Sequence, residues 1–120
     1  MNRFVVEYTK IVEYSTWAVD AVTAEAEAAA QPDYHATHSV TDEGAFPFTV
    51  GQVVYTFDKD IDAILEGSVT SVDFLNSNTV NTYARMGSEA SDRVYSYVEG
   101  VVVDLYATKQ EVIDYLEREL

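Results

Sequence analysis

Residues 51–57 read Gly51-Gln52-Val53-Val54-Tyr55-Thr56-Phe57, and this stretch opens the series of strands that decides the fold. β-branched and aromatic residues in this density are typical of strands. A second strand is predicted over residues 64–74, where Gly67 marks a kink or a bulge. Short antiparallel strands separated by tight turns predict a small barrel over residues 48–120. The remaining predicted strands cover residues 79–86, 93–98 and 101–105.

The chain ends in a predicted helix that begins at a capping box. Thr108 and Glu111 have the spacing at which the threonine hydroxyl accepts from the Glu111 N–H and the glutamate side chain returns a bond. An apolar stripe then recurs at helical spacing, opposite Asp114, Glu117 and Arg118. This pattern predicts a helix that packs on the barrel and closes it. The stripe consists of Val112, Ile113, Tyr115, Leu116 and Leu120.

The N-terminal part predicts a β-hairpin followed by a short helix. Residues 3–19 are rich in β-branched and aromatic side chains and too long for one strand, so we expect a turn near Thr9-Lys10 or Tyr14-Ser15. Thr23 is the expected N-cap of an alanine-rich helix over residues 24–31, which the next residue, a proline, ends.

Residues 32–47 lack a clear period and are interpreted as a linker or functional loop. The fold class is therefore α+β. Residues 1–47 form a strand–strand–helix segment with a loop, residues 48–120 form a barrel with a C-terminal helix, and we expect the two to make one compact unit.

A set of motif positions runs through the second half of the chain. It opens with a Gly-x-x-Val strand beside an aromatic residue, continues with a Glu-Gly-x-Val strand and a tyrosine-bearing strand, and closes with aromatic-x-Thr-Lys-x-Glu before a helix. This pattern resembles a small SH3-like barrel module that recurs in uncharacterised phage and bacterial proteins. The resemblance implies a phage or prophage accessory protein and transfers no active-site residues. The positions are Gly51, Val54, Tyr55, Thr56, Glu66-Gly67-Ser68-Val69, Tyr83 and Tyr106-Ala107-Thr108-Lys109-Gln110-Glu111.

The chain is strongly acidic, with 21 Asp and Glu against 7 Lys and Arg and a net charge of −14. Such a field repels phosphates and anionic membranes, so direct binding to nucleic acid or a membrane is not expected. Ten acids lie in residues 1–60 and eleven in residues 61–120, as on a folded acidic surface rather than a tail. Two interpretations stay open: solubility in salty surroundings, or docking on a basic partner by imitation of a polyanion.

The chain contains no cysteine, which excludes disulfides and thiolate chemistry. The N-terminus has no apolar run long enough for a signal peptide, and no window approaches a membrane span. We therefore expect the protein in the cytoplasm, of an infected host if it is phage-encoded.

Only one cluster has the composition of a transition-metal site. His35 and His38 lie near Asp33, Asp42 and Glu43, and two imidazoles with a carboxylate suit zinc or iron. No helical pattern fixes their geometry, so solvated loop histidines are favoured. The sequence predicts no cofactor and no metal, with His35 and His38 as weak candidates.

The segment Asp58-Lys59-Asp60-Ile61-Asp62 has the alternating acids of an EF-hand loop. Ala63 at the sixth position and Val69 at the twelfth exclude that motif, which needs Gly and Glu there. A hairpin turn between the first two barrel strands is predicted instead.

Catalysis is not expected, because the chain lacks a Gly-x-Ser-x-Gly elbow and a Gly-rich phosphate loop. Nine tyrosines are more informative, since tyrosine suits interfaces and β-structure alike. Tyr95 and Tyr97 share one face of a strand, so they belong either to the core or to an adhesive patch. The predicted interaction surface consists of Tyr34, Asp58, Asp60, Asp62, Tyr95 and Tyr97.

These features predict a non-enzymatic accessory protein that binds a host or phage protein. A sharper form is an inhibitor of a nucleic-acid-handling defence system, of the anti-restriction or anti-CRISPR type, whose carboxylates occupy a groove meant for phosphates. One alternative is a small structural, assembly or adaptor component of a phage, with a homodimer left open. Another is a small metal-dependent enzyme centred on His35 and His38.

Overall fold

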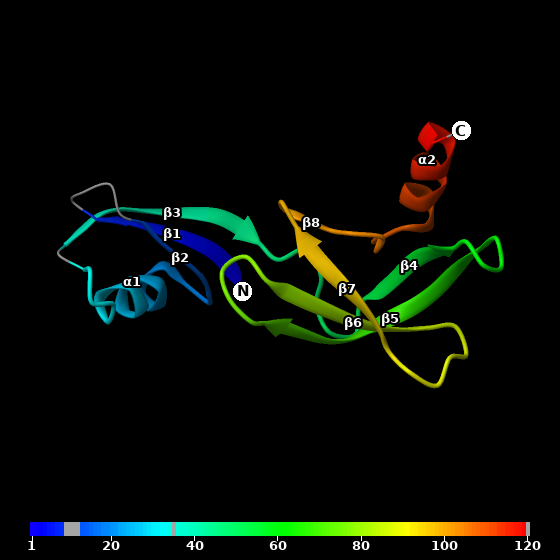
Figure 1. Cartoon of the computed structure of the whole chain (residues 1–120), viewed down its shortest axis with the longest axis horizontal. Coiled ribbons are helices and arrows are strands. Elements are labelled where there is room, and N and C mark those ends of the chain that lie inside the picture. Colours follow the sequence, from blue (N-terminus) through cyan, green and yellow to red (C-terminus); the bar gives the residue numbers. More distant parts are fainter. Residues whose placement is uncertain (9–12, 35, 120) are drawn as a thin grey trace. The chain divides into compact units, whose positions relative to one another are not determined.

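The computed structural model describes residues 1–8, 13–34 and 36–119. Contacts within the chain group into two compact units, Met1–Phe46 and Pro47–Leu120, which are called unit 1 and unit 2 below. Each unit combines antiparallel strands with one helix, so the predicted mixture of α and β structure is confirmed (Figure 1). No described helix is both long and apolar enough to cross a membrane.

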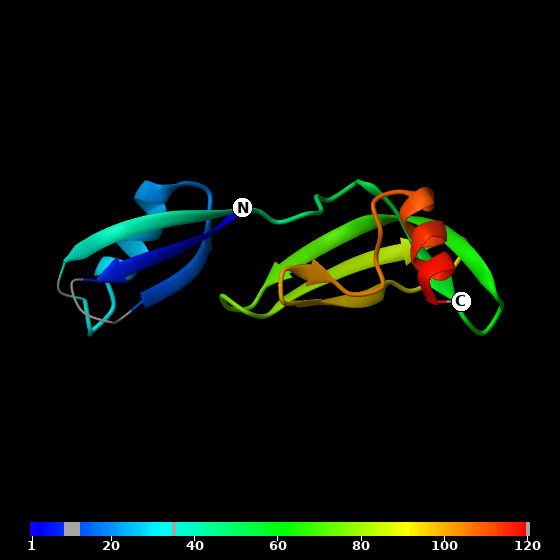
Figure 2. The same cartoon turned by 90° about the horizontal axis from the view of Figure 1, so that it is seen from above.

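Unit 1 is a three-stranded antiparallel sheet with a helix across one face (Figure 2). The central strand β1 alternates, and its buried residues Phe4, Val6 and Tyr8 pack on Ala24 and Ala28 of the helix. The small alanines let the helix lie close to the sheet. The elements are β1 (Asn2–Tyr8), β2 (Glu13–Ala18), α1 (Ala21–Ala29) and β3 (Thr37–Ala45), in the sheet order β2-β1-β3.

The predicted N-terminal hairpin is confirmed, because β1 and β2 pair antiparallel. The alternative turn at Tyr14-Ser15 is wrong, since both residues lie inside β2 and pair with β1. The other candidate, Thr9-Lys10, lies outside the described residues.

Helix α1 begins three residues earlier than predicted. Asp20, not Thr23, is the N-cap: its carboxylate accepts a hydrogen bond of 2.8 Å from the Thr23 backbone N–H. That bond also lowers the pKa of Asp20, because it stabilises the ionised carboxylate. Aspartate competes well for this position, and its extended backbone leaves the next residue free to start the helix.

The prediction of a loop over residues 32–47 is wrong, because nine of these residues form strand β3. β3 pairs along β1 at the edge of the sheet. Its sequence is polar, and polar cross-strand contacts help to hold it. The Asn2 amide donates to Asp42 at 3.0 Å, and Arg3 forms an ion pair with Glu43. An edge strand of this kind has no apolar alternation that the sequence could reveal.

Unit 2 is a five-stranded antiparallel meander followed by a helix, as predicted. The fifth predicted strand is shorter than expected and is followed by a turn. The elements are β4 (Val53–Asp58), β5 (Ala63–Phe74), β6 (Val80–Met86), β7 (Arg93–Val98), β8 (Val101–Val102) and α2 (Lys109–Glu119).

The sheet of unit 2 curls into a half-barrel (Figure 1). The chain that follows β8 returns to β4, the first strand of this sheet. Tyr55 in β4 and Tyr106 exchange both backbone hydrogen bonds, at 2.8 and 2.9 Å. Next to them the buried Thr56 hydroxyl donates to the Asp104 carbonyl at 2.8 Å. The long strand β5 has an irregular register between Val69 and Ser71, where it bends. The buried interior includes Phe48, Val54, Val69, Val80, Ala84, Met86, Tyr95, Val102, Leu105 and Val112, together with the polar residues Thr56 and Thr82.

Helix α2 begins at the predicted capping box, but the hydrogen bond accepted by the Glu111 side chain comes from Ala107 instead of Thr108. The Glu111 N–H donates to the Thr108 hydroxyl at 3.2 Å, whereas the Glu111 carboxylate accepts from the Ala107 N–H at 3.1 Å. The helix packs against β4, and Val112 is its one buried residue within the described range. Leu120 of the predicted stripe lies outside that range.

Candidate protein-docking site

The predicted interaction residues are divided between the two units. Tyr34 belongs to unit 1, where its ring packs edge-on against Tyr8 at 5.1 Å and its hydroxyl lies 3.0 Å from the Thr37 hydroxyl. In unit 2, Tyr95 is only 8% exposed, and Tyr97 is half-buried on the same face of β7. Tyr34 and Tyr95 therefore pack within their own units.

Asp58, Asp60 and Asp62 border or lie in the β4–β5 hairpin turn, as predicted for this segment. The Asp58 carboxylate accepts from the Asp60 N–H at 2.9 Å, and Asp62 adopts a left-handed backbone with φ of 51°. Asp60 and Asp62 are exposed. The Asp58 side chain is only 14% exposed, because it faces Arg93.

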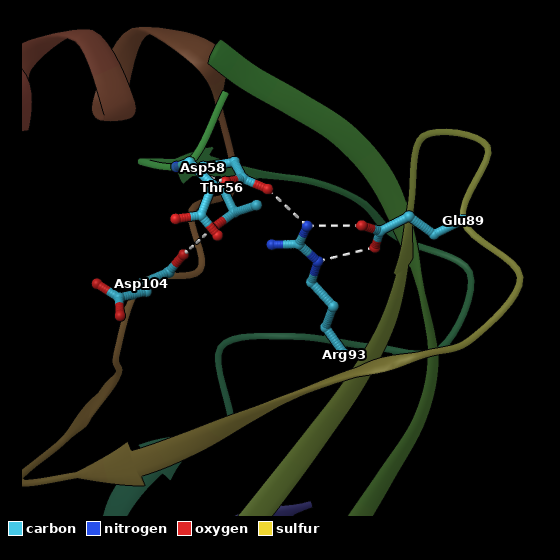
Figure 3. Close-up of polar contacts among 6 residues, drawn as sticks. Thr56, Asp58, Glu89, Arg93 and Asp104 are labelled. Atoms are coloured by element: carbon cyan, nitrogen blue, oxygen red, sulfur yellow. Dashed lines mark hydrogen bonds and ion pairs between the residues drawn. The ribbon is translucent and has the colours of Figure 1, made fainter. Parts of the chain in front are cut away.

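Arg93 joins three segments of unit 2 through two carboxylates (Figure 3). Its guanidinium donates to Asp58 at 2.8 Å and to both oxygens of Glu89, at 2.8 and 2.6 Å. Glu89 lies in the β6–β7 connection and Asp58 at the end of β4. The contacts with Arg93 lower the pKa of both carboxyls, and the carboxylates raise the pKa of Arg93. These charged hydrogen bonds connect neighbouring segments of unit 2. Because the two carboxylates already accept hydrogen bonds from Arg93, they are less available to a partner.

We expect Arg93→Met to weaken folding in a pH-dependent way. The pKa values of Asp58 and Glu89 are depressed below their ordinary 3.8 and 4.5, so the pairing stabilises the fold above those values and is lost as pH falls through the folded-state values. The difference between wild type and variant in the urea midpoint should be largest near pH 7 and should shrink as the pH falls below the ordinary carboxyl values. A difference that is equal at every pH would contradict this assignment. Arg85→Met, which removes a more exposed pair with Asp92, serves as the control and should have the smaller effect.

The metal candidates gain no support from geometry. His35 lies outside the described residues, and for His38 only the backbone, in β3, is described. Among the residues with described positions, no group of three or more His, Asp or Glu side chains could hold a metal ion.

A groove beside α2 brings together acids and tyrosines that the predicted set omitted. Its larger hollow is an open surface depression of about 580 Å³, and it is lined by Tyr106, Glu111, Asp114, Glu117 and Arg118. A second hollow of about 260 Å³ adjoins it at Tyr106. We call the two hollows together the α2 groove. The second hollow is lined by Phe57, Lys59, Asp104, Tyr106 and Tyr115.

Two tyrosine rings form the aromatic wall of the α2 groove. Tyr106 and Tyr115 have ring centroids 5.9 Å apart at an interplanar angle of 39°. Burial raises the pKa of Tyr106, and the nearby Tyr115, Asp104 and Glu111 act in the same direction. Its hydroxyl therefore stays protonated at neutral pH and can donate a hydrogen bond.

The acids of the α2 groove follow from helical spacing. Glu111, Asp114 and Glu117 are three residues apart, which places them along one side of α2. All three are exposed. This spacing is visible in the sequence and could have indicated an acidic helix face. The hollow between that face and Tyr106 depends on the return of the chain to β4, which no local pattern reports.

Comparison with protein families, with characterised proteins and with solved structures finds no match to this chain.

Proposed function

We propose that this chain is a non-enzymatic accessory protein, of the phage type, that binds a host or phage protein through the α2 groove. The observation that carries the proposal is the groove itself, in which two tyrosines and four carboxylates line adjoining hollows. Aromatic anchors beside polar groups are typical of sites where one protein docks on another. The excess of acidic over basic residues favours a partner with a basic surface.

Unit 2 is proposed to be an SH3-like barrel. The strand order β4-β5-β6-β7-β8 and the pairing of Tyr106 with Tyr55 support a five-stranded sheet that turns back on its first strand. In this proposal the barrel is a scaffold that holds α2 and Tyr106 at fixed positions, and the binding residues lie on its closing segment.

The proposal has a sharper form, in which the partner is a nucleic-acid-handling defence protein of the host. Both units are acidic: unit 1 carries eight acids against two basic residues, and unit 2 carries thirteen against five. In this form of the proposal, carboxylates of unit 2 occupy a basic groove of the partner that normally holds phosphates. A DNA duplex would then compete with this protein for its partner.

A specific apolar patch favours a second candidate function, an assembly component that forms homodimers. Val98 and Val101 are cross-strand partners on β7 and β8, and they are 52% and 61% exposed. Val94 and Val103 are also exposed nearby in the chain. In this case association would bury valines and would resist salt.

The proposed function predicts salt-sensitive capture of a partner that depends on the α2 groove. Immobilised protein should retain a partner from host lysate at about 0.05 M salt and release it by about 0.5 M, because exposed charges are screened. An Asp114→Asn/Glu117→Gln double variant should retain at most about a tenth as much, since it removes two groove charges without touching the helix cap.

The matched control is Asp73→Asn/Glu99→Gln, which removes two exposed acids of unit 2 that do not line the groove. It should capture the partner about as well as the wild type. Equal losses in the two double variants would argue against the groove and leave only a general effect of charge. Capture that persists at high salt, together with a dimer in solution, would favour the assembly component instead.

A further inference from the structure

Arg118 differs from the other arginines of the chain. Arg3, Arg85 and Arg93 each form an ion pair with a carboxylate, whereas Arg118 forms none with any residue in the described ranges. It stands one helical turn after Asp114, a spacing that often gives an ion pair. It lines the larger hollow of the α2 groove instead, and its charge lowers the pKa of Tyr106 against the effect of burial. Arg118 thus places a cation beside the aromatic wall.

We infer that the α2 groove binds an arginine side chain of the partner, and that Arg118 is an internal cation that competes for the same place. The inference rests on the proposed function and names the group that enters the groove. A guanidinium is planar and weakly hydrated, so it stacks on a tyrosine ring while its N–H groups reach carboxylates. A lysine ammonium is compact and strongly hydrated, so it interacts less favourably with the tyrosine rings.

The hydrogen bonds in the groove show which acceptors are free for that arginine. One oxygen of Glu111 accepts from the Ala107 N–H, and one oxygen of Asp114 accepts from Gln110 at 2.9 Å. Glu117 accepts no hydrogen bond from any described residue. Each of the three acids therefore retains at least one carboxylate oxygen for an incoming donor.

The charges around Tyr106 favour a cation over an anion. Four acids line the two hollows, against only Lys59 and Arg118. A phosphate or a carboxylate from a partner would meet this negative excess, whereas a guanidinium would reduce it. A partner that brings an arginine must still overcome repulsion from Arg118, which lowers the affinity of the resting groove.

The test uses three short peptides in which glycines separate two arginines, two lysines or two citrullines. Citrulline has nearly the shape of arginine without its charge. Titration into ¹⁵N-labelled full-length protein at low salt reports both the affinity and the amides that shift. We expect the arginine peptide to bind about threefold more tightly than the lysine peptide, and the citrulline peptide at least about tenfold more weakly. The shifting amides should centre on Tyr106 and α2.

Two arginine variants isolate the role of Arg118. Arg118→Gln should raise the affinity for the arginine peptide about three- to fivefold, because it removes a like charge from the site. Arg85→Gln changes the net charge equally but lies outside the groove, so its affinity should stay within about twofold of wild type. Equal gains in both variants, or a loss in Arg118→Gln, would overturn the inference.

The outcomes separate this inference from the proposed function. If Asp114→Asn/Glu117→Gln abolishes partner capture but the citrulline peptide binds as well as the arginine peptide, the groove docks a partner through some other group. In that case the arginine inference fails and the proposed function stands. If neither partner capture nor peptide binding responds to the groove variants, both fail.

Discussion

Gly67→Ala is expected to destabilise unit 2 by about 3 kcal/mol, which is a large part of the stability of a unit of this size. Gly67 in β5 pairs with Met86 in β6, and a Cβ added to it would collide with the carbonyl group of Arg85. Its distance to the Arg85 carbonyl carbon would be 2.9 Å, and to the Met86 sulfur 2.5 Å. Because the obstacle is backbone, β6 must move and part of the ladder is lost. Thermal unfolding should show a midpoint lower by about 15 °C.

Two further variants make the test specific to the backbone collision. Ser68→Val adds a larger side chain at the adjacent, exposed position of β5, and should change stability by no more than about 0.5 kcal/mol. Met86→Ala in the Gly67→Ala background removes the sulfur but leaves the Arg85 carbonyl in place, so it should not restore stability. Recovery in that double variant would show that side-chain crowding, not backbone contact, requires glycine here.

Val112→Asp is expected to release α2 from the sheet of unit 2. Val112 is fully buried and is the helix's one buried residue within the described range. An ionised carboxylate at this position would lie in an apolar interior without a cation, which costs several kcal/mol. Detaching an eleven-residue helix costs less than unfolding the sheet, so the helix should separate and then fray, since isolated short helices are unstable in water.

The loss of α2 can be measured by circular dichroism and by the partner-capture experiment. α2 contributes eleven of the helical residues and α1 nine, so the helical signal should fall by about half while the sheet signal remains. Partner capture should be lost, because one wall of the groove is gone. Gln110→Asp adds the same charge at an exposed position of α2 and should leave the helical signal unchanged. An unchanged signal in Val112→Asp would mean that α2 docks without this side chain.

The sequence predicted those elements whose residues follow a strong local pattern, such as the alternation of a half-buried strand or the capping box of a helix. The alternation of Phe4, Val6 and Tyr8 indicates a strand with one buried face, and the pair Thr108 and Glu111 indicates the start of a helix. Strand β3 was not predicted, because an edge strand can consist mostly of polar residues and is held by its hydrogen bonds to the neighbouring strand, here β1.

The candidate site was harder to predict than the fold, because it is made by residues brought together over a long distance in the chain. Asp58 belongs to an acidic run that indicates an exposed turn, yet Arg93, thirty-five residues later, occupies its carboxylate. Tyrosine is enriched at interfaces, but the side chain of Tyr95 is buried within unit 2. The acids of α2 were visible at helical spacing, whereas the placement of Phe57 and Lys59 in one hollow with Tyr115 of α2 depends on tertiary structure.

The bridge between Tyr55 and Tyr106 has a consequence for the order of folding. Its two residues are fifty-one positions apart in the chain, so the loop that must close before the bridge forms is longer than the loop of any strand pairing in unit 2. The hairpins of the meander close much shorter loops and can form first, because the entropy lost on closure grows with loop length. Tyr106 of this bridge lines both hollows of the α2 groove, so we expect the groove to be assembled last. Under the proposed function, we therefore expect that a nascent or partly unfolded chain cannot bind a partner before the sheet of unit 2 has formed.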